Sequence, residues 1–215
     1  VQHGASYEPA QRAVAAVAAG QRAAATLAGA ADPAEILLGP STTVLVQNLA
    51  RALVAGGAIG PGDEVIVTDC DHEANVGPWR RLAELGVTVR EWTLDPRSLR
   101  LRAEELTPLL SPRTRVVAFT HCSNVLGSLH DVAALAAPAR AVGARVVVDG
   151  VAFAPHRLLD VEALGVDFYV FSLYKVFGPH LAALWGRRAS FLALGKLNHE
   201  FVADDDVPYK PVSYT

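Results

Sequence analysis

The stretch Asp167-Phe-Tyr-Val-Phe-Ser-Leu-Tyr-Lys-Val-Phe-Gly-Pro-His180 places a single lysine, Lys175, after an apolar and aromatic run. Residues 168–171 are β-branched or aromatic without a polar break, which predicts a short strand buried on both faces. Gly178-Pro179 predicts a turn, so Lys175 is expected just past the end of a strand. An ammonium held against apolar surroundings loses proton affinity, and such a lysine can form Schiff bases with carbonyls. The alternative is a surface lysine whose stem covers apolar side chains.

Strand patterns and helix patterns alternate along the rest of the chain. Strands are predicted at 35–38, 64–68, 87–92, 114–120 and 145–148, and helices at 8–27, 44–54, 76–85, 102–110 and 132–142. These spacings require crossover connections, so the sheet should be mostly parallel with helices on both faces. The predicted fold class is therefore α/β, a three-layer αβα sandwich.

Composition narrows the class of protein. A chain of 215 residues that is 51% hydrophobic is long enough for one large domain with a substantial core. A net charge of -3 with mixed signs favours neither nucleic acid nor an anionic membrane as a partner. Apolar runs are short and the N-terminus lacks the layout of a signal peptide, so no membrane helix is predicted and a cytoplasmic location is expected. Cys70 and Cys122 suit neither a disulfide framework nor a metal site, and each is interpreted as a buried apolar residue.

Polar residues stand at the ends of the predicted strands or just beyond them. In a parallel sheet these ends lie at one edge, which predicts a shared cleft. Asp149 follows the apolar run 146–148 and would be buried as an anion, so it needs a cationic partner such as the protonated ring nitrogen of a cofactor. It could instead be a turn residue before Gly150. The strand-end residues are Thr43, His72, Asn124, Asp149, Ser172 and Lys175.

The segment Gly39-Pro-Ser-Thr-Thr43 joins a predicted strand to a predicted helix. Such a turn offers hydroxyls, free backbone N–H groups and the positive end of a helix dipole, which together bind phosphate. The same residue types are typical of an ordinary helix cap, and this segment alone favours the cap over the phosphate site.

Four motifs carry a resemblance to a known family: Val147-Val-Asp149-Gly, the stretch 167–179, Asp71-His72-x-Ala-Asn75-x-x-Pro-Trp79 and Thr120-His-x-Ser-Asn-Val-Leu-Gly127. Together they resemble the class V aminotransferase group, and within it the cysteine desulfurase-like branch of the fold type I pyridoxal 5'-phosphate enzymes. The resemblance implies that residues 1–195 form the cofactor-binding large domain. It also implies that 196–215 begin the connection to a C-terminal small domain, and that this small domain and an N-terminal segment of the full enzyme are missing from this chain.

The resemblance also implies roles for three catalytic residues. Lys175 would form the Schiff base with pyridoxal phosphate and later move the proton at the substrate α-carbon. Asp149 would pair with the pyridinium nitrogen, so that the ring acts as an electron sink. His72 would stack on the ring face and assist proton transfer, unless it is a histidine of a solvent-exposed loop.

The remaining cofactor contacts are implied in the same way. Ser172 and Thr43, with Thr42 as a neighbour, would hold the phosphate. Tyr174 stands where the family often has a phosphate-binding histidine, and its hydroxyl can substitute. Asn124 would approach the cofactor hydroxyl or the substrate carboxylate, or else support the turn before Gly127.

Two departures bear on the reaction. Ala152 stands where desulfurases commonly have a glutamine, and Cys122 does not match the position of their nucleophile, so it is interpreted as a core residue. The persulfide-forming cysteine and the arginine that binds the substrate carboxylate are expected beyond Thr215.

The resemblance therefore implies a pyridoxal phosphate enzyme that acts on an amino acid, built as a homodimer with its sites at the subunit interface. Carbon–sulfur cleavage is the leading reaction, and a sulfur-acceptor protein is the partner that it implies. Transamination, epimerisation and a catalytically silent scaffold remain as alternatives, although the presence of both Lys175 and Asp149 argues against the scaffold. A nucleotide-binding module is disfavoured because the chain has neither Gly-x-Gly-x-x-Gly after its first strand nor a Walker-type lysine motif.

Overall fold

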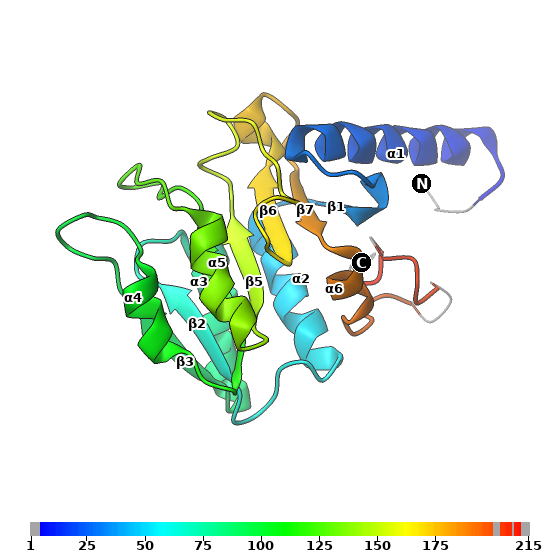
Figure 1. Cartoon of the computed structure of the whole chain (residues 1–215). Helices are drawn as coiled ribbons and strands as arrows, with labels where there is room; N and C mark the ends of the chain where they lie inside the picture. Colours follow the sequence, from blue (N-terminus) through cyan, green and yellow to red (C-terminus); the bar gives the residue numbers. More distant parts are fainter. Residues whose placement is uncertain (1–4, 200–202, 208, 212–215) are drawn as a thin grey trace.

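The computed structural model describes residues 5–199, 203–207 and 209–211, which form one seven-stranded sheet covered by helices (Figure 1). The predicted connecting segment 196–215 therefore lies partly outside the described residues. The strands are β1 (Ile36–Gly39), β2 (Glu64–Thr68), β3 (Thr88–Trp92), β4 (Thr114–Thr120), β5 (Arg145–Asp149), β6 (Phe168–Ser172) and β7 (Ala182–Gly186). The α-helices are α1 (Glu8–Ala28), α2 (Thr42–Ala55), α3 (Glu73–Arg80), α4 (Ala103–Leu106), α5 (Val132–Ala141) and α6 (Arg188–Leu192). Four 3-10 helices complete the elements: η1 (Pro33–Glu35), η2 (Arg81–Leu85), η3 (Thr107–Leu109) and η4 (Leu173–Val176).

The sheet has the strand order β1-β7-β6-β5-β4-β2-β3 and is mostly parallel. Only β7 runs against its two neighbours, β1 and β6, while every other pair of adjacent strands is parallel. Because β1 therefore points the same way as β6, the start of α2 lies at the same edge as the ends of β4, β5 and β6. That edge is where open α/β sheets bind their ligands.

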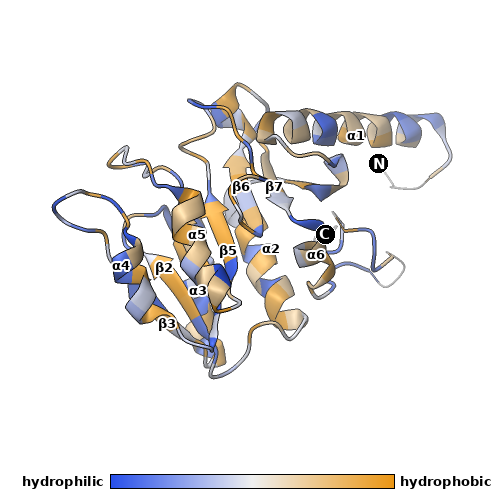
Figure 2. Ribbon diagram, viewed as in Figure 1, coloured by the Kyte–Doolittle hydropathy of each residue, from blue (hydrophilic) through white to orange (hydrophobic). Residues whose placement is uncertain are grey.

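Two hydrophobic clusters fill the space between the sheet and its helices. One contains residues of α1, α4 and α5, and the other contains residues of α2, α3 and α6, so helices cover both faces. The middle residues of β2 and β5 and the first four residues of β6 are apolar or aromatic, and these strands are mostly orange in Figure 2. The predicted three-layer αβα sandwich with a mostly parallel sheet is confirmed.

Helix α1 is confirmed, but only the last part of it packs into the core. Only Ala24, Ala25 and Ala28, near its end, belong to a core cluster, whereas Val14 and Val17 are exposed. The helix ends at Gly29, whose φ of 69° is the left-handed conformation that closes many helices. Its first turns extend away from the sheet, as Figure 1 shows, which explains why their apolar side chains meet solvent.

Two predicted helices have different limits in the structure. The helix expected at 76–85 begins three residues earlier, because the side chain of His72 caps α3, and it tightens into η2 after Arg80. The helix expected at 102–110 is divided into the short α4 and η3, since Pro108 cannot continue the hydrogen-bonding pattern of α4.

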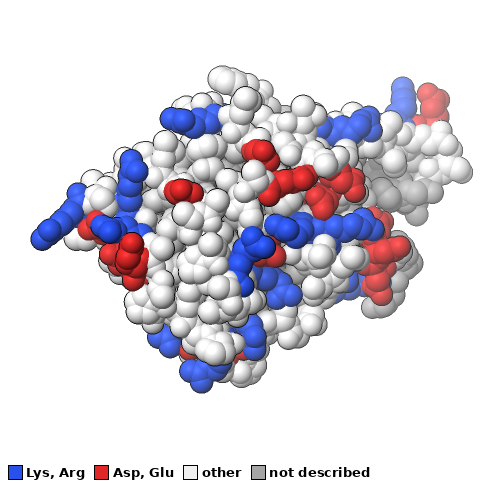
Figure 3. Space-filling model, in the orientation of Figure 1, with Lys and Arg blue, Asp and Glu red and all other residues white. Residues whose placement is uncertain are grey.

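Charged residues of both signs lie side by side on the face shown in Figure 3. Within the described residues, no helix combines the length and apolar character needed to cross a bilayer.

One carboxylate, Glu64, is buried at the start of β2 with only 1% of its surface exposed. Arg90 lies 2.9 Å and Arg113 3.2 Å from its Oε1 atom, and the Ser111 hydroxyl donates a 2.6 Å hydrogen bond to Oε2. Hydrogen bonds from Arg90 and Ser111 outweigh the effect of burial and lower the pKa of Glu64 from 4.5 to about 2. This cluster ties the starts of β2, β3 and β4 together.

The Glu64→Gln variant is expected to lower the free energy of unfolding by about 2 kcal/mol at pH 7, because the buried side chain loses its charge-assisted hydrogen bonds from Arg90 and Ser111. A carboxylate with a depressed native pKa stabilises the protein above its unfolded pKa, and this stabilisation is lost as the pH falls from 4.5 toward 2. The difference between the variant and the wild type should therefore shrink over that range in denaturant titrations. The control is Glu91→Gln, which breaks an exposed ion pair with Arg80 and should cost less than about 1 kcal/mol. Equal losses in the two variants would contradict the role given to Glu64.

Candidate active site

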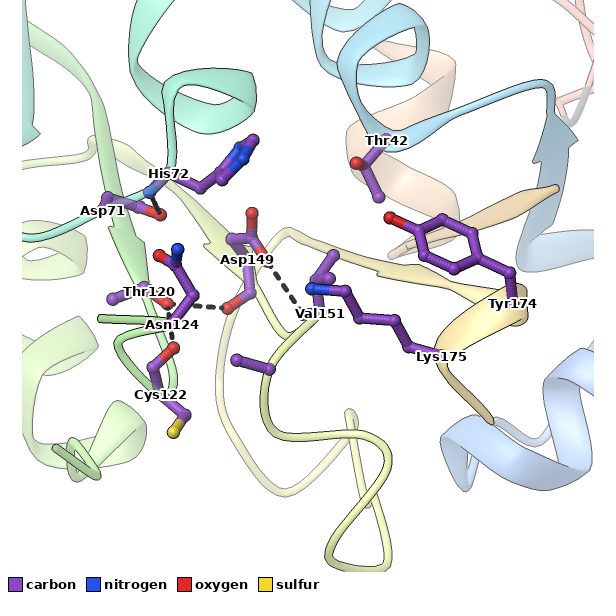
Figure 4. A pocket seen from close by; sticks show the side chains of 11 residues that line it. Thr42, Asp71, His72, Thr120, Cys122, Asn124, Asp149, Val151, Tyr174 and Lys175 are labelled. Atoms are coloured by element: carbon purple, nitrogen blue, oxygen red, sulfur yellow. Dashed lines mark hydrogen bonds between the residues drawn. The ribbon is translucent and has the colours of Figure 1, made fainter. Parts of the chain in front are cut away.

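A pocket opens at the carboxyl edge of the sheet, where β4, β5 and β6 end and α2 begins. Its residues come from five separate segments of the chain, and Figure 4 shows them around a common space. The lining consists of Thr42, Asp71, His72, Thr120, Cys122, Asn124, Asp149, Val151, Ala152, Tyr174 and Lys175. The structure therefore brings together most of the residues that the sequence predicted for one cleft.

Asp149 ends β5 and is 3% exposed. Its Oδ1 atom accepts a 2.8 Å hydrogen bond from the backbone N–H of Val151, and no described residue donates a hydrogen bond to Oδ2. Burial raises the pKa of Asp149, opposed by the Val151 N–H and by the nearby charges of His72 and Lys175. The protein thus holds a buried carboxylate with one oxygen free to accept a cationic donor.

Lys175 lies in η4, directly after β6, as predicted, and its side chain extends toward Asp149 in Figure 4. The prediction of apolar surroundings is wrong for the described residues, because Lys175 is exposed. The physical reason is the single 3-10 turn after Ser172, which carries the lysine from the buried strand to the mouth of the pocket. Lys175 and Asp149 nevertheless face one pocket from neighbouring strands.

His72 both caps α3 and lines the pocket. Its Nδ1 atom accepts a 3.0 Å hydrogen bond from the N–H of Ala74 and so caps α3. An acceptor Nδ1 requires that the proton of the neutral ring sit on Nε2. The ring itself lies along the pocket wall, so His72 can present an N–H group to a ligand.

The structure separates the two threonines at the start of α2. Thr42 is buried and lines the pocket, whereas Thr43 is exposed and is not part of the lining. Ser41 caps the helix, with its Oγ accepting a hydrogen bond from the N–H of Val44 at 3.2 Å. Successive residues of a helix point about 100° apart, so only one of the two threonines can face the pocket.

Tyr174 lines the pocket next to Lys175, and its hydroxyl points toward Thr42 in Figure 4. Its ring stacks on His180, with ring centroids 4.9 Å apart. Ser172 is 1% exposed and does not line the pocket, and its Oγ has no hydrogen-bond partner among the described residues. Asn124, in the exposed loop after β4, is part of the lining.

Several lining residues were missed or misinterpreted at the level of sequence, among them Asp71 and Cys122. Asp71 accepts 2.7 Å hydrogen bonds from the His72 N–H and from the Asn75 side chain, and burial together with the charge of Asp149 raises its pKa. The only signal for Asp71 was its place beside His72 in the motif. Cys122 was interpreted as a core residue, which is wrong: it is half-buried and lines the pocket. The Thr120 hydroxyl, 2.7 Å from the Cys122 carbonyl oxygen, turns the chain there.

Comparison with known proteins identifies the family. The family model for class V aminotransferases matches residues 1–200. The aminotransferase-like protein FGM3 of Gibberella zeae is 44% identical over 207 residues, which are 95% of this chain and 50% of that protein. The cysteine desulfurase-like protein ustD of Aspergillus flavus is 40% identical over 186 residues, covering 83% of this chain and 42% of that protein.

A solved structure supports the same assignment. The cysteine desulfurase CsdA of Escherichia coli superposes with a TM-score of 0.79 at 31% identity, covering 91% of this chain and 49% of that one. The chain thus spans about half the length of these relatives. With a family model matched over most of its length, and with cysteine desulfurases among its relatives of known sequence and structure, this chain belongs to the class V aminotransferase family.

Proposed function

We propose that this chain is the cofactor-binding part of a pyridoxal 5'-phosphate enzyme that acts on an amino acid, and that the leading reaction is carbon–sulfur cleavage of a cysteine-type substrate. The observation that carries the proposal is that the amine of Lys175 and the carboxylate of Asp149 face one pocket. In this proposal residues 1–195 form the cofactor-binding large domain and 196–215 begin the connection to a small domain.

The residues of the pocket fit this cofactor at both of its ends. Asp149 offers a buried carboxylate oxygen that a protonated ring nitrogen would satisfy. Thr42 stands at the N-terminus of the fourteen-residue α2, and the hydroxyl of Tyr174 points toward it, which suits a phosphate group. The buried Ser172 hydroxyl lacks a partner among the described residues but does not line the pocket, so its contact with the phosphate stays a prediction. Thr43, by contrast, is exposed and does not line the pocket.

The residues of the chain have distinct tasks in this mechanism. The cofactor supplies an electron sink for the charge that develops at the substrate α-carbon. The amine of Lys175 holds the cofactor and moves the proton at that carbon. Asp149, whose own carboxylate is buried, would keep a proton on the ring nitrogen by ion pairing. His72, with its Nε2–H directed to the pocket, orients the ring and donates a hydrogen bond to a leaving group.

Transamination and epimerisation use the same lysine and aspartate, so they are the alternatives to carbon–sulfur cleavage. The relatives named as cysteine desulfurases favour cleavage. A silent scaffold is disfavoured because a buried carboxylate such as Asp149 lowers stability unless a ligand uses it.

The proposal includes a homodimer with its sites at the subunit interface. Exposed apolar side chains adjoin two lining residues: Val125, 81% exposed, follows Asn124, and Phe177, fully exposed, lies two positions after Lys175. A second chain that packed beside these segments would remove both side chains from water, which supports the dimer. A sulfur-acceptor protein as partner and a cytoplasmic location belong to the same proposal, by the family relationship to cysteine desulfurases.

The experiment that tests the reaction uses the full-length protein with pyridoxal phosphate, L-cysteine and dithiothreitol as the reductant. We expect sulfide and alanine in equal amounts. Pyruvate and ammonia with sulfide would indicate an eliminating lyase, which is still carbon–sulfur cleavage. A keto acid without sulfide, or D-cysteine, would overturn the proposed cleavage in favour of transamination or epimerisation.

A further inference from the structure

A hydrogen bond of 2.8 Å joins the Nδ1 atom of His121 to the hydroxyl of Tyr169. His121 directly follows β4, and Tyr169 lies in β6, so the two residues stand on either side of β5, the strand that ends at Asp149. Both side chains are buried, with 7% and 0% exposed. The bond therefore bridges the strand that carries the candidate catalytic carboxylate.

The space for this bridge comes from Gly150. A Cβ atom at position 150 would lie 2.1 Å from Cε1 and 2.2 Å from the hydroxyl oxygen of Tyr169, so the aromatic ring occupies the place of a side chain. The Gly150 N–H donates a 2.8 Å hydrogen bond to the Val170 carbonyl oxygen, which holds the backbone against β6. Glycine is required here because of the close approach of Tyr169.

His121 holds the same segment from the other side. Its backbone N–H donates a 2.9 Å hydrogen bond to the Asp149 carbonyl oxygen. Its ring stacks on Phe153, with centroids 3.6 Å apart and an angle of 10° between the planes. Phe153 belongs to the turn after Asp149, since its N–H donates to the Gly150 carbonyl oxygen at 3.0 Å. The bridge thus contacts the peptide after Asp149 and the turn that supplies the Val151 N–H.

Both partners of the bridge are neutral near pH 7. Burial, with a smaller effect of His130, lowers the pKa of His121 to about 4, and burial followed by the charge of Asp149 raises the pKa of Tyr169 well above its usual value. Asp131, which also acts on His121, opposes the shift without reversing it. The contact is therefore a neutral hydrogen bond that persists through the pH range in which the site would work.

We propose that His121 and Tyr169 are positioning residues that hold the Asp149 carboxylate with one oxygen on the Val151 N–H and the other toward the pocket. This inference deepens the proposed function and rests on it. Neither residue lines the pocket, so both act through Asp149.

The test is Tyr169→Phe, which keeps the ring and removes only the hydroxyl. In the cofactor-free protein, hydrogen exchange of the Val151 amide should become about fivefold faster, the factor expected for the loss of one neutral hydrogen bond. With cofactor, kcat should fall about tenfold at unchanged KM, and in an Asp149→Asn background the same change should alter kcat less than twofold, because coupled residues are not additive. Tyr7→Phe is the control and should leave every reading unchanged.

Equal effects of Tyr169→Phe in the two backgrounds, or an unchanged Val151 amide, would show a merely structural tyrosine and overturn the inference. His121→Phe, which keeps an aromatic ring on Phe153 but lacks Nδ1, gives a second measurement if the first variant does not fold. The exchange measurement needs neither cofactor nor turnover. A wild-type protein that fails to bind pyridoxal phosphate would therefore refute the proposed function alone. Hydrogen exchange of the Val151 amide would still test the role of the hydrogen bond between His121 and Tyr169.

Discussion

Lys175→Ala is expected to reduce turnover of an amino acid by about 10³-fold or more, because it removes both the covalent attachment point and the group that moves the α-proton. The wild-type protein mixed with pyridoxal phosphate and reduced with borohydride should carry the cofactor on Lys175. Peptide mass spectrometry locates the modified residue, and the variant should lose that label.

The sequence offers matched controls because it contains only two other lysines, Lys196 and Lys210. Lys196 forms an ion pair with Asp204 at 3.3 Å, and Lys210 donates a 3.0 Å hydrogen bond to the Leu192 carbonyl oxygen. Lys196→Ala should keep both turnover and the label on Lys175. A label on Lys196 or Lys210 in the wild type, or full turnover by Lys175→Ala, would refute the assignment.

Asp149→Asn is expected to keep the cofactor bound but to lower kcat by about 10²-fold, the factor that matches the loss of a charge-assisted hydrogen bond. The neutral amide can still accept the Val151 N–H but no longer stabilises a protonated ring nitrogen. The ¹⁵N chemical shift of ring-labelled pyridoxal phosphate reports that protonation directly, so the midpoint of its pH titration should move to lower pH in the variant.

The same substitution should raise the melting temperature of the cofactor-free protein at pH 7. A carboxylate whose native pKa is raised favours the folded state only while protonated, so it costs stability as the pH rises above the unfolded value of 3.8. Asparagine carries no charge, so the Asp149→Asn variant does not lose stability as the pH rises. Asp160→Asn, a change in an exposed aspartate that accepts a hydrogen bond from Ala163, is the control for both readings. Unchanged turnover of Asp149→Asn would count against the ring-nitrogen role.

The sheet and the position of the pocket were predictable because they depend on local patterns. Buried parallel strands need continuous apolar segments such as 146–148 and 168–171, and polar residues after them must collect at one edge. Lys175, Asp149, His72 and Asn124 were placed correctly in this way. Helix limits were less predictable, since the cap that starts α3 is a histidine side chain and not one of the usual capping residues.

Other features of the site depended on three-dimensional packing. In the folded α2, Thr42 lines the pocket and Thr43 does not. The 3-10 turn after β6 leaves Lys175 exposed. The folded loop after β4 brought Cys122 into the pocket. Neighbouring residues of a turn or helix point in different directions. The spacing of polar residues in the sequence does not show which of two neighbours faces the pocket.

The sequence alone therefore determined the layered α/β fold, the family motifs and the edge of the sheet where a lysine and an aspartate meet, because strand burial and chain direction follow from neighbouring residues. Only the tertiary structure decided which atoms face the pocket and which lie behind it. His121 and Tyr169 are 48 positions apart and come together only because β5 lies between their strands with a glycine at its end. Contacts across a sheet arise from the packing of distant segments, and no local pattern specifies them.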